Sequence, residues 1–411
     1  MSRFLFTTLT SDDLGLLART LPIACQLAAR GHDVAYCNQA PAPRALIEGE
    51  AHLDNLALSP GLLPRTFAPP TPEVWNMDHF WALVGCGDAD YVLAAVQSMA
   101  TLMEEFQPDA VVDSWNITAC LAARITRRPL VTILQGDMHP ANDGFIWWRE
   151  PPRDVPSALA AVNATLRHYG LSEARKSEDL MVGGLTLIAG TPVTDPVPYG
   201  TDAVYIGPVL WQKHDAELPD WAARLGRTRP LVWVYSGNPS YGIVTWADSV
   251  AIIRSCVAAL ADEDLDVVLT TGHHDLPGGT AALPRNFRFE AYLPGQLMAQ
   301  KSALLVHHGG HGSCMTGLVA GTPAVIIPTY SERESNARRV AALGAGKVVL
   351  PSTTDTGEKN VSADAVRAAV VHVLSEPAFL ANARRVAASM SAYGGASEAA
   401  ALIEAFAAAG R

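Results

Sequence analysis

The stretch ALLVHHGGHGSCMTGLVA, residues 303–320, joins a short apolar run to a helical run through a turn of histidine, glycine and serine. A four-residue apolar run before such a turn is typical of a buried strand in a parallel sheet. Small residues there let a ligand approach the backbone, and the free N–H groups and dipole of the helix start favour an anion. The stretch predicts a phosphate or diphosphate cradle, although a tight turn with solvated histidines also fits these residues.

The same alternation of apolar runs and Ala/Leu-rich stretches continues on both sides of this turn. Strands are predicted at residues 4–9, 33–37, 110–112, 130–134 and 185–189, and again at 231–235, 266–271, 287–292, 303–306, 324–327 and 347–350. Helices between successive strands imply parallel pairs with right-handed crossovers. We therefore predict two doubly wound α/β halves, residues 1–205 and 230–387, joined by a polar linker at 206–229. A ligand cleft is expected between the halves.

The composition of the 411 residues limits the kinds of protein to consider. Hydrophobic residues make up 49% and charged residues 17%, which excludes disorder as the main state. The formal net charge of −11 argues against sequence-independent binding of nucleic acid or anionic lipid, but not against one local anion site. Six cysteines without paired spacing indicate neither a disulfide framework nor a zinc module. With no leader-like start and no long apolar run, we expect a cytoplasmic protein without membrane contact.

Residues around the glycine turn extend the pattern into a longer signature. The segments 292–294 (YLP), 321–328 (GTPAVIIP) and 331–337 (SERESNA) flank it over about fifty residues. Together they resemble the donor-binding signature of family 1 glycosyltransferases of the GT-B type, in which two Rossmann-like domains face a central cleft. The likeness is closest to the bacterial branch that glycosylates polyketides and other natural products, including erythromycin-type sugar transferases. Residues 21–24 (LPIA) and 30–34 (RGHDV) resemble the family more weakly.

The resemblance implies roles for residues in and around the predicted cradle. His308 would contact the donor phosphates, and Leu293 and its neighbours would hold the nucleobase through main-chain groups. Glu332 stands where the family grips donor-sugar hydroxyls, and Arg333 stands where it usually has glutamine, which leaves the sugar preference open. The other donor-site residues that the resemblance implies are Gly310, Gly312, Ser313, Ser236 and Gly237. For the last two, an ordinary strand-ending turn is the alternative.

Sugar transfer to a hydroxyl needs a general base, and the family commonly supplies a histidine in the loop after the first strand. Here that loop reads TSDDLG, residues 10–15, and contains no histidine. Asp13 or Asp12 could serve as the base if burial raises the pKa, and either could equally cap the following helix. Asp137 and His139 follow a later strand on the same side and are the other candidates, with a structural loop role as the alternative.

Aromatic residues gather in the N-terminal half, where the resemblance places the acceptor. We interpret five residues there as candidates for an apolar acceptor pocket: Trp75, Trp81, Asp113, Trp147 and Trp148. Core packing explains about half of such aromatics equally well. Trp147 and Trp148 lie in a polar, loop-like context and are the better candidates.

Two short runs of metal-ligating residue types do not predict a metal site. The triplet DED at 262–264 falls between a predicted helix and strand, where a solvated turn is expected. The triplet HHD at 273–275 enters a Pro/Gly loop, and no third ligand stands at a metal-like spacing. We therefore expect no metal and no cofactor, with a nucleoside-diphosphate sugar as co-substrate.

The sequence as a whole predicts an inverting, metal-independent glycosyltransferase, inversion being implied by the resemblance. It would move a sugar from a nucleoside diphosphate, dTDP in preference to UDP, to a small hydrophobic acceptor such as a polyketide or aromatic aglycone. The resemblance places the acceptor on residues 1–205, with a last helix at about 388–411 packed back on them, and the donor on residues 230–387. The alternatives are a sugar-nucleotide epimerase on the same fold and an inactive donor-binding homologue. A homodimer is left open.

Overall fold

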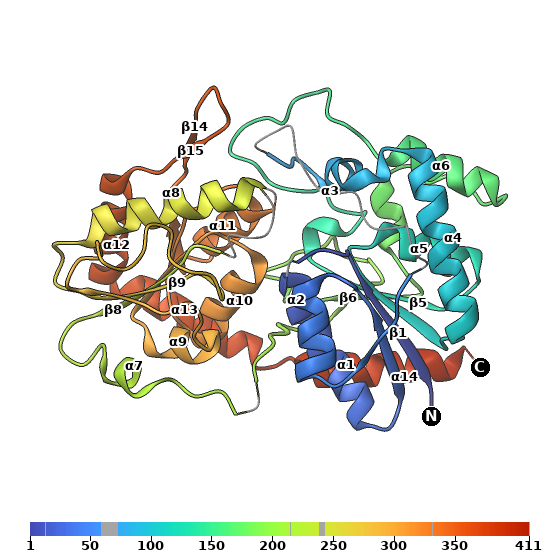
Figure 1. Ribbon diagram of the computed structural model, residues 1–411, viewed down its shortest axis with the longest axis horizontal. Helices are drawn as coiled ribbons and strands as arrows, with labels where there is room; N and C mark the ends of the chain where they lie inside the picture. Colours follow the sequence, from blue (N-terminus) through green and yellow to red (C-terminus); the bar gives the residue numbers. More distant parts are fainter. Residues whose placement is uncertain (13, 59–72, 214, 238–242, 331, 411) are drawn as a thin grey trace.

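The computed structural model describes the chain except residues 13, 59–72, 214, 238–242, 331 and 411. It contains two separate parallel sheets, each covered by helices, which lie side by side in Figure 1. The predicted α/β architecture of two Rossmann-like domains is therefore confirmed.

The first sheet has the strand order β3-β2-β1-β4-β5-β6-β7, and all neighbouring strands are parallel. The order reverses between β1 and β4, so the loops that follow these two strands open onto a crevice at the carboxyl edge. The strand bounds are β1 Arg3–Thr8, β2 Asp33–Cys37, β3 Asp54–Asn55, β4 Ala110–Ser114, β5 Leu130–Leu134, β6 Leu185–Ile188 and β7 Val204–Tyr205.

The second sheet has the order β10-β9-β8-β11-β12-β13, again with parallel neighbours throughout. Its order reverses between β8 and β11, which places the glycine-rich turn after β11 at the corresponding crevice. The bounds are β8 Leu231–Tyr235, β9 Asp266–Thr270, β10 Phe287–Phe289, β11 Leu304–His307, β12 Ala324–Ile326 and β13 Gly346–Val348. A separate antiparallel pair consists of β14 Ser352–Thr353 and β15 Lys359–Asn360.

Helices connect the strands in both halves. In the first half they are α1 Leu14–Ala29, α2 Pro41–Arg44, α3 Met77–Trp81, α4 Ala89–Phe106, α5 Ile117–Ile125 and α6 Leu159–His168, with short helical segments at Ala45–Glu50, Ala82–Cys86, Gly136–Met138 and Ser177–Met181. In the remainder they are α7 Asp220–Arg224, α8 Ile243–Leu260, α9 Gly295–Lys301, α10 His311–Ala320, α11 Arg333–Ala342, α12 Ala363–Ser375, α13 Pro377–Met390 and α14 Gly395–Ala409. Among the described residues, no helix combines the length and apolar character that crossing a bilayer requires.

The last helix leaves the second sheet and packs under the first (Figure 1). Ala399 and Ile403 of α14 are fully buried in the same core cluster as Phe4 of β1. Glu404 fixes the outer face of the helix by accepting hydrogen bonds from Arg30 at 2.5 Å and bonding the His32 ring at 2.6 Å. Helix α13, by contrast, packs in the core of the second sheet. The chain therefore crosses between the halves a second time, at residues 391–394.

Candidate functional site

A cavity of about 330 Å³ opens where the carboxyl edges of the two sheets face each other. The first half contributes the start of α1, including Leu16 and Arg19, together with Phe80 and Trp115. The second half contributes the ends of β8 and β11 and the first turn of α10. The cavity thus has one largely apolar wall and one wall built from the glycine-rich turn.

Tight backbone packing fixes the glycine-rich turn at the start of α10. Gly309 has a φ of +88°, and a Cβ there would lie 2.9 Å from the Arg333 carbonyl oxygen. A Cβ at Gly310 would lie 2.5 Å from Nε2 of His308. Gly310 is the N-cap residue, and no side chain of the described residues caps the helix. The first-turn N–H groups of α10 are therefore available to an anion in the cavity.

Burial keeps two histidines next to this turn, His307 and His308, in the neutral form. Burial lowers the pKa of His307 to about 3. Burial, and then the charge of Arg333, lowers the pKa of His308 well below its ordinary range. Among the described residues, neither Nε2 of His307 nor Nδ1 of His308 has a hydrogen-bond partner, although both rings line the cavity. Unpartnered buried polar atoms of this kind call for a ligand with matching hydrogen-bonding groups.

The structure brings most of the predicted donor-site residues together on this wall. The cavity is lined by Leu293, His308, Gly310, Gly312, Ser313, Glu332 and Arg333. The Arg333 guanidinium donates to Thr329 Oγ1 at 2.6 Å and lies 4.4 Å from the ring centroid of Tyr330. Arg333 is therefore fixed at the cavity rather than paired with its neighbour Glu334.

Ser236 and Gly237 lie behind the cavity wall instead of on it. The buried Ser236 hydroxyl accepts a hydrogen bond from Ser249 Oγ at 2.6 Å. Gly237 has a φ of +92°, and a Cβ there would lie 3.1 Å from the His308 ring. Gly237 therefore packs behind His308, and neither of these two residues lines the cavity in the described part of the chain.

The base candidates in the loop after β1 do not face the cavity where they are described. Asp13 lies outside the described residues. Asp12 is exposed, and its Oδ1 accepts a hydrogen bond from the backbone N–H of Ala42 at 3.1 Å, at the start of α2. The Asp12 carboxylate is therefore bound to a backbone N–H of α2, not of the helix α1 that follows it, and lies outside the cavity lining.

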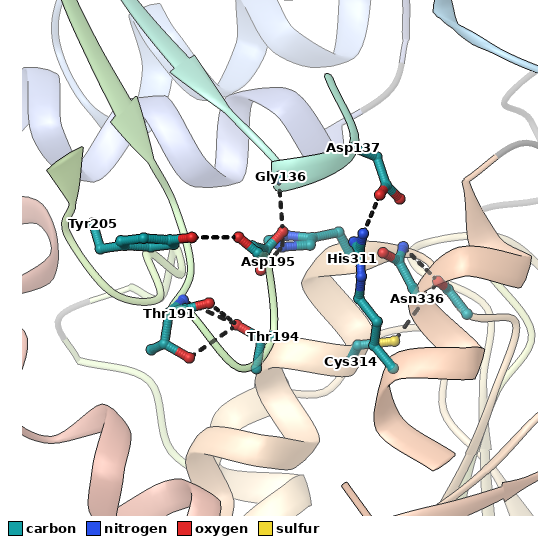
Figure 2. Close-up of polar contacts among 11 residues, drawn as sticks. Gly136, Asp137, Thr191, Thr194, Asp195, Tyr205, His311, Cys314 and Asn336 are labelled. Carbon is teal, nitrogen blue, oxygen red and sulfur yellow. Dashed lines mark hydrogen bonds and ion pairs between the residues drawn. The ribbon is translucent and has the colours of Figure 1, made fainter. Parts of the chain in front are cut away.

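Asp137 and His139 are likewise absent from the cavity wall. Asp137 forms an ion pair with Arg339 of α11 in the other half (Figure 2 draws this contact). Burial raises the pKa of Asp137 to about 6, although Arg339 opposes that shift. His139 is 7% exposed, and its Nδ1 accepts a hydrogen bond from Ala141 N at 3.1 Å. Both predicted bases thus make structural contacts at their loop.

Two of the predicted acceptor residues belong to the core of the first half. Trp81 is 0% exposed, and its Nε1 donates to the Trp115 carbonyl at 3.1 Å. Asp113 is also 0% exposed and accepts from Thr7 Oγ1 at 2.6 Å and Asn116 N at 3.1 Å. Burial raises its pKa to about 7. Neither side chain lines the cavity, because both are buried in the core and hydrogen-bonded there.

The other three predicted tryptophans lie outside the cavity lining. Trp75 and Trp147 have ring centroids 4.5 Å apart and planes tilted by 52°, and Trp147 Nε1 donates to the Trp75 carbonyl at 3.0 Å. Trp148 is 38% exposed; its N–H donates to Glu334 Oε1 at 2.6 Å, and the Arg338 guanidinium lies 5.1 Å from its ring. Trp147 and Trp148 therefore contact α11 of the other half, and none of the three lines the cavity.

The aromatic wall of the cavity is formed by Phe80, Trp115 and Trp211, which are not among the five acceptor candidates. Phe80 and Trp115 pack edge to face, with centroids 5.5 Å apart, and Trp211 of the segment between the halves joins them on the wall. Trp115 has a φ of +73°, and its Nε1 has no hydrogen-bond partner among the residues described. Trp115 directly follows β4, so its position after the carboxyl end of a strand is the signal that could have indicated it.

Comparisons with known proteins agree with this geometry. Residues 254–406 match the family model described as erythromycin biosynthesis protein CIII-like, C-terminal domain. The chain is 29% identical to the NDP-glycosyltransferase YjiC of Bacillus subtilis (strain 168) over 320 residues, 76% of each chain. It is 27% identical to the erythronolide mycarosyltransferase of Saccharopolyspora erythraea over 294 residues, 70% of this chain and 66% of that one.

Solved structures share the fold over the whole chain. The spinosyn forosaminyltransferase SpnP superposes with a TM-score of 0.71 at 22% identity and covers 99% of both chains. The glycosyltransferase VinC, solved in complex with dTDP, superposes with a TM-score of 0.67 at 21% identity over 98% of this chain and 99% of that one. The two facing sheets, the glycine-rich turn and the named relatives lead to one conclusion: the chain is a glycosyltransferase of the natural-product type with the GT-B fold, and its residues 254–406 are similar to the erythromycin biosynthesis protein CIII-like C-terminal domain.

Proposed function

We propose that this glycosyltransferase moves a sugar, with inversion and without a metal ion, from a nucleoside-diphosphate sugar to a small hydrophobic acceptor. One observation carries the proposal. A single cavity joins the open first turn of α10 and two neutral histidines on one wall to Phe80, Trp115 and Leu16 on the other. The first wall suits a diphosphate, and the second suits an apolar aglycone.

We favour dTDP over UDP as the nucleotide of the donor. A neighbour of the same fold, VinC, is described in complex with dTDP, and the erythronolide mycarosyltransferase is a relative. Leu293 and Tyr292 line the end of the cavity that would take the base, and Tyr292 stacks on His273 with ring centroids 4.2 Å apart.

Two features of the cavity wall support metal independence. Of the described residues that line it, Glu332 alone carries a carboxylate. The start of α10 and the Arg333 guanidinium supply positive potential for a diphosphate without a cation. EDTA is expected to leave the turnover rate unchanged.

The proposal is tested by incubation of the protein with dTDP- and UDP-sugars and a panel of polyketide and phenolic acceptors. A mass increase of one sugar is expected, with an inverted anomeric configuration by NMR. Thermal unfolding adds a binding test, because a ligand specific for the native state raises the melting temperature. We expect dTDP to raise it more than UDP, and NAD not at all. Exchange at a sugar carbon without acceptor would indicate an epimerase instead, and donor binding without transfer to any acceptor would contradict the proposal.

A further inference from the structure

A histidine and a carboxylate from opposite halves meet beside the glycine-rich turn. His311 is the first residue of α10 and is 6% exposed, and Asp195, in the loop between β6 and β7, is 0% exposed. Nε2 of His311 lies 3.2 Å from both carboxylate oxygens of Asp195. Figure 2 shows this pair at the centre of the contacts between the halves. The pair belongs to none of the base candidates that the sequence suggested.

The backbone around Asp195 leaves space for this carboxylate and fixes it. The N–H of Gly136 donates to Asp195 Oδ1 at 3.2 Å. A Cβ at Gly190 would overlap Asp195 Oδ2, so only glycine fits there. The Asp195 main chain is held as well, because its N–H donates to Thr191 O at 2.8 Å and its carbonyl accepts from the Tyr205 hydroxyl at 2.9 Å.

The environment also keeps Asp195 ionised. Burial alone would raise its pKa, but the neighbouring His311 and Arg339 and the Gly136 N–H outweigh burial and hold the pKa below its ordinary value. A negative carboxylate against Nε2 selects the tautomer of His311 that carries its proton on Nε2. The lone pair is then on Nδ1, which makes no hydrogen bond to any residue that the structure describes.

His311 also lies on the wall of the cavity in which we propose that the sugar is transferred. Its side chain lines the cavity, two residues before Ser313 in the turn proposed for the diphosphate. Helix α10 packs against α1, whose residues Leu16 and Arg19 line the opposite wall. Of the described histidines on the cavity wall, His311 is the one with a carboxylate within hydrogen-bond distance of its ring.

We propose that His311 is the general base of the transfer and that Asp195 is its positioning residue. This inference rests on the proposed function above. The acceptor oxygen attacks the anomeric carbon and forms the new glycosidic bond, while its proton passes to Nδ1 of His311. The bond from the anomeric carbon to the phosphate oxygen breaks, and the nucleoside diphosphate leaves with the electron pair. The imidazolium, stabilised by the Asp195 carboxylate, then returns its proton to solvent.

The test compares two directions of the reaction in His311→Gln. Forward transfer to an aliphatic alcohol acceptor needs a base, so its kcat should fall by about 100- to 10,000-fold. The reverse reaction is run from dTDP and the 2-chloro-4-nitrophenyl glycoside of the sugar that the wild-type protein transfers. Its leaving group departs as a stable phenolate without a proton, so kcat there should change by less than about tenfold. The melting-temperature shift with dTDP should match that of the wild-type protein.

Asp195→Asn is the second variant, because it keeps the size of the side chain and removes only its charge. It should show a smaller loss than His311→Gln in the forward direction and little loss in reverse. His168→Gln, at an exposed position of α6 outside the cavity lining, is the matched control and should keep both activities. Because two variants, His311→Gln and Asp195→Asn, are compared, the test still gives a result if one of them folds poorly.

The outcomes separate this inference from the proposed function. Equal losses in both directions would show that His311 holds the sugar or the diphosphate and would overturn its role as base. Full forward activity of His311→Gln would overturn it as well. If the wild-type protein forms no product with any donor in either direction, the proposed function itself falls.

Discussion

At the scale of single residues, the cavity wall at the glycine-rich turn contains two imidazoles, His307 and His308, that burial keeps neutral. A neutral His308 can donate a hydrogen bond from one ring nitrogen and accept one at the other. Residue 310 has to be glycine, because a Cβ there would collide with the His308 ring. The largely apolar wall of the cavity includes Trp115, whose positive φ turns the chain at the end of β4. Such a conformation is uncommon for a bulky residue and is often found at functional sites.

His308→Ala is expected to weaken dTDP binding about 10- to 100-fold, because it removes a buried hydrogen-bonding group from the phosphate wall. Titration calorimetry with dTDP measures the change. His168→Ala, at an exposed position of α6 outside the cavity lining, serves as the control and should bind as the wild-type protein does. Unchanged affinity in His308→Ala would contradict the assignment of this ring to the diphosphate.

Asp113 gives the stability a predictable pH dependence. Burial raises its pKa from 3.8 to about 7, so the native state holds the proton more tightly than the unfolded chain. The resulting stabilisation is fully present below about pH 4 and is lost as the pH rises to about 7. Asp113→Asn cannot ionise, so its free energy of unfolding should decline less over this window. Urea titrations at pH 4 to 8 measure it, with the exposed Asp90→Asn as control. Parallel curves for Asp113→Asn and wild type would refute the shift.

At the scale of elements, contiguous features were predictable and assembled features were not. The turn after β11 is a local pattern, so residues 303–320 indicated a strand, a glycine-rich turn and a helix together. The neighbouring residues that the sequence predicted for the donor site also line the cavity. The largely apolar wall of the cavity combines residues of α1, Phe80, Trp115 and the segment that contains Trp211. No spacing in the sequence brings these together, because their meeting depends on the strand order 2-1-4 and on the contact between the halves.

Helix α14 illustrates the same point for stability. Ile403 is fully buried in the core beneath the first sheet, although it lies near the end of the chain. Ile403→Ala should lower the free energy of unfolding by about 2–4 kcal/mol, because it leaves a cavity beside α1. Leu380→Ala on α13, at a position 37% exposed, is the control and should cost much less. Urea unfolding measures both, and equal effects would argue against the packing of α14 described here.

At the scale of the whole molecule, buried charges connect the halves away from the cavity. Lys359 of β15 has a side chain 2% exposed and donates to Glu73 Oε1 of the first half at 2.6 Å. Burial alone would raise the pKa of Glu73, but Lys359 and Arg149 hold it below the ordinary value. The ion pair of Asp137 with Arg339 and the hydrogen bond from Trp148 to Glu334 join the same two halves.

Lys359→Met should destabilise the protein by about 3 kcal/mol, because it leaves the buried Glu73 with less compensation. Glu73→Gln combined with Lys359→Met should recover much of that loss, since neither buried charge of the pair then remains and the Arg149 side chain is 47% exposed. Thermal and urea unfolding of the single and double variants measure the coupling. Additive losses in the double variant would show that the two side chains do not act as a pair.

The return of the chain through residues 391–394 has a consequence for engineering. The Gly395 N–H donates to the Ile206 carbonyl at 2.8 Å, so the outward and the returning segments run next to each other. The half that contains the second sheet is therefore an insertion within the half that contains the first sheet. The chain enters and leaves it at adjacent segments. A chimaera that exchanges this half between related enzymes has to be cut at both segments, because a single junction would leave α14 on a foreign partner.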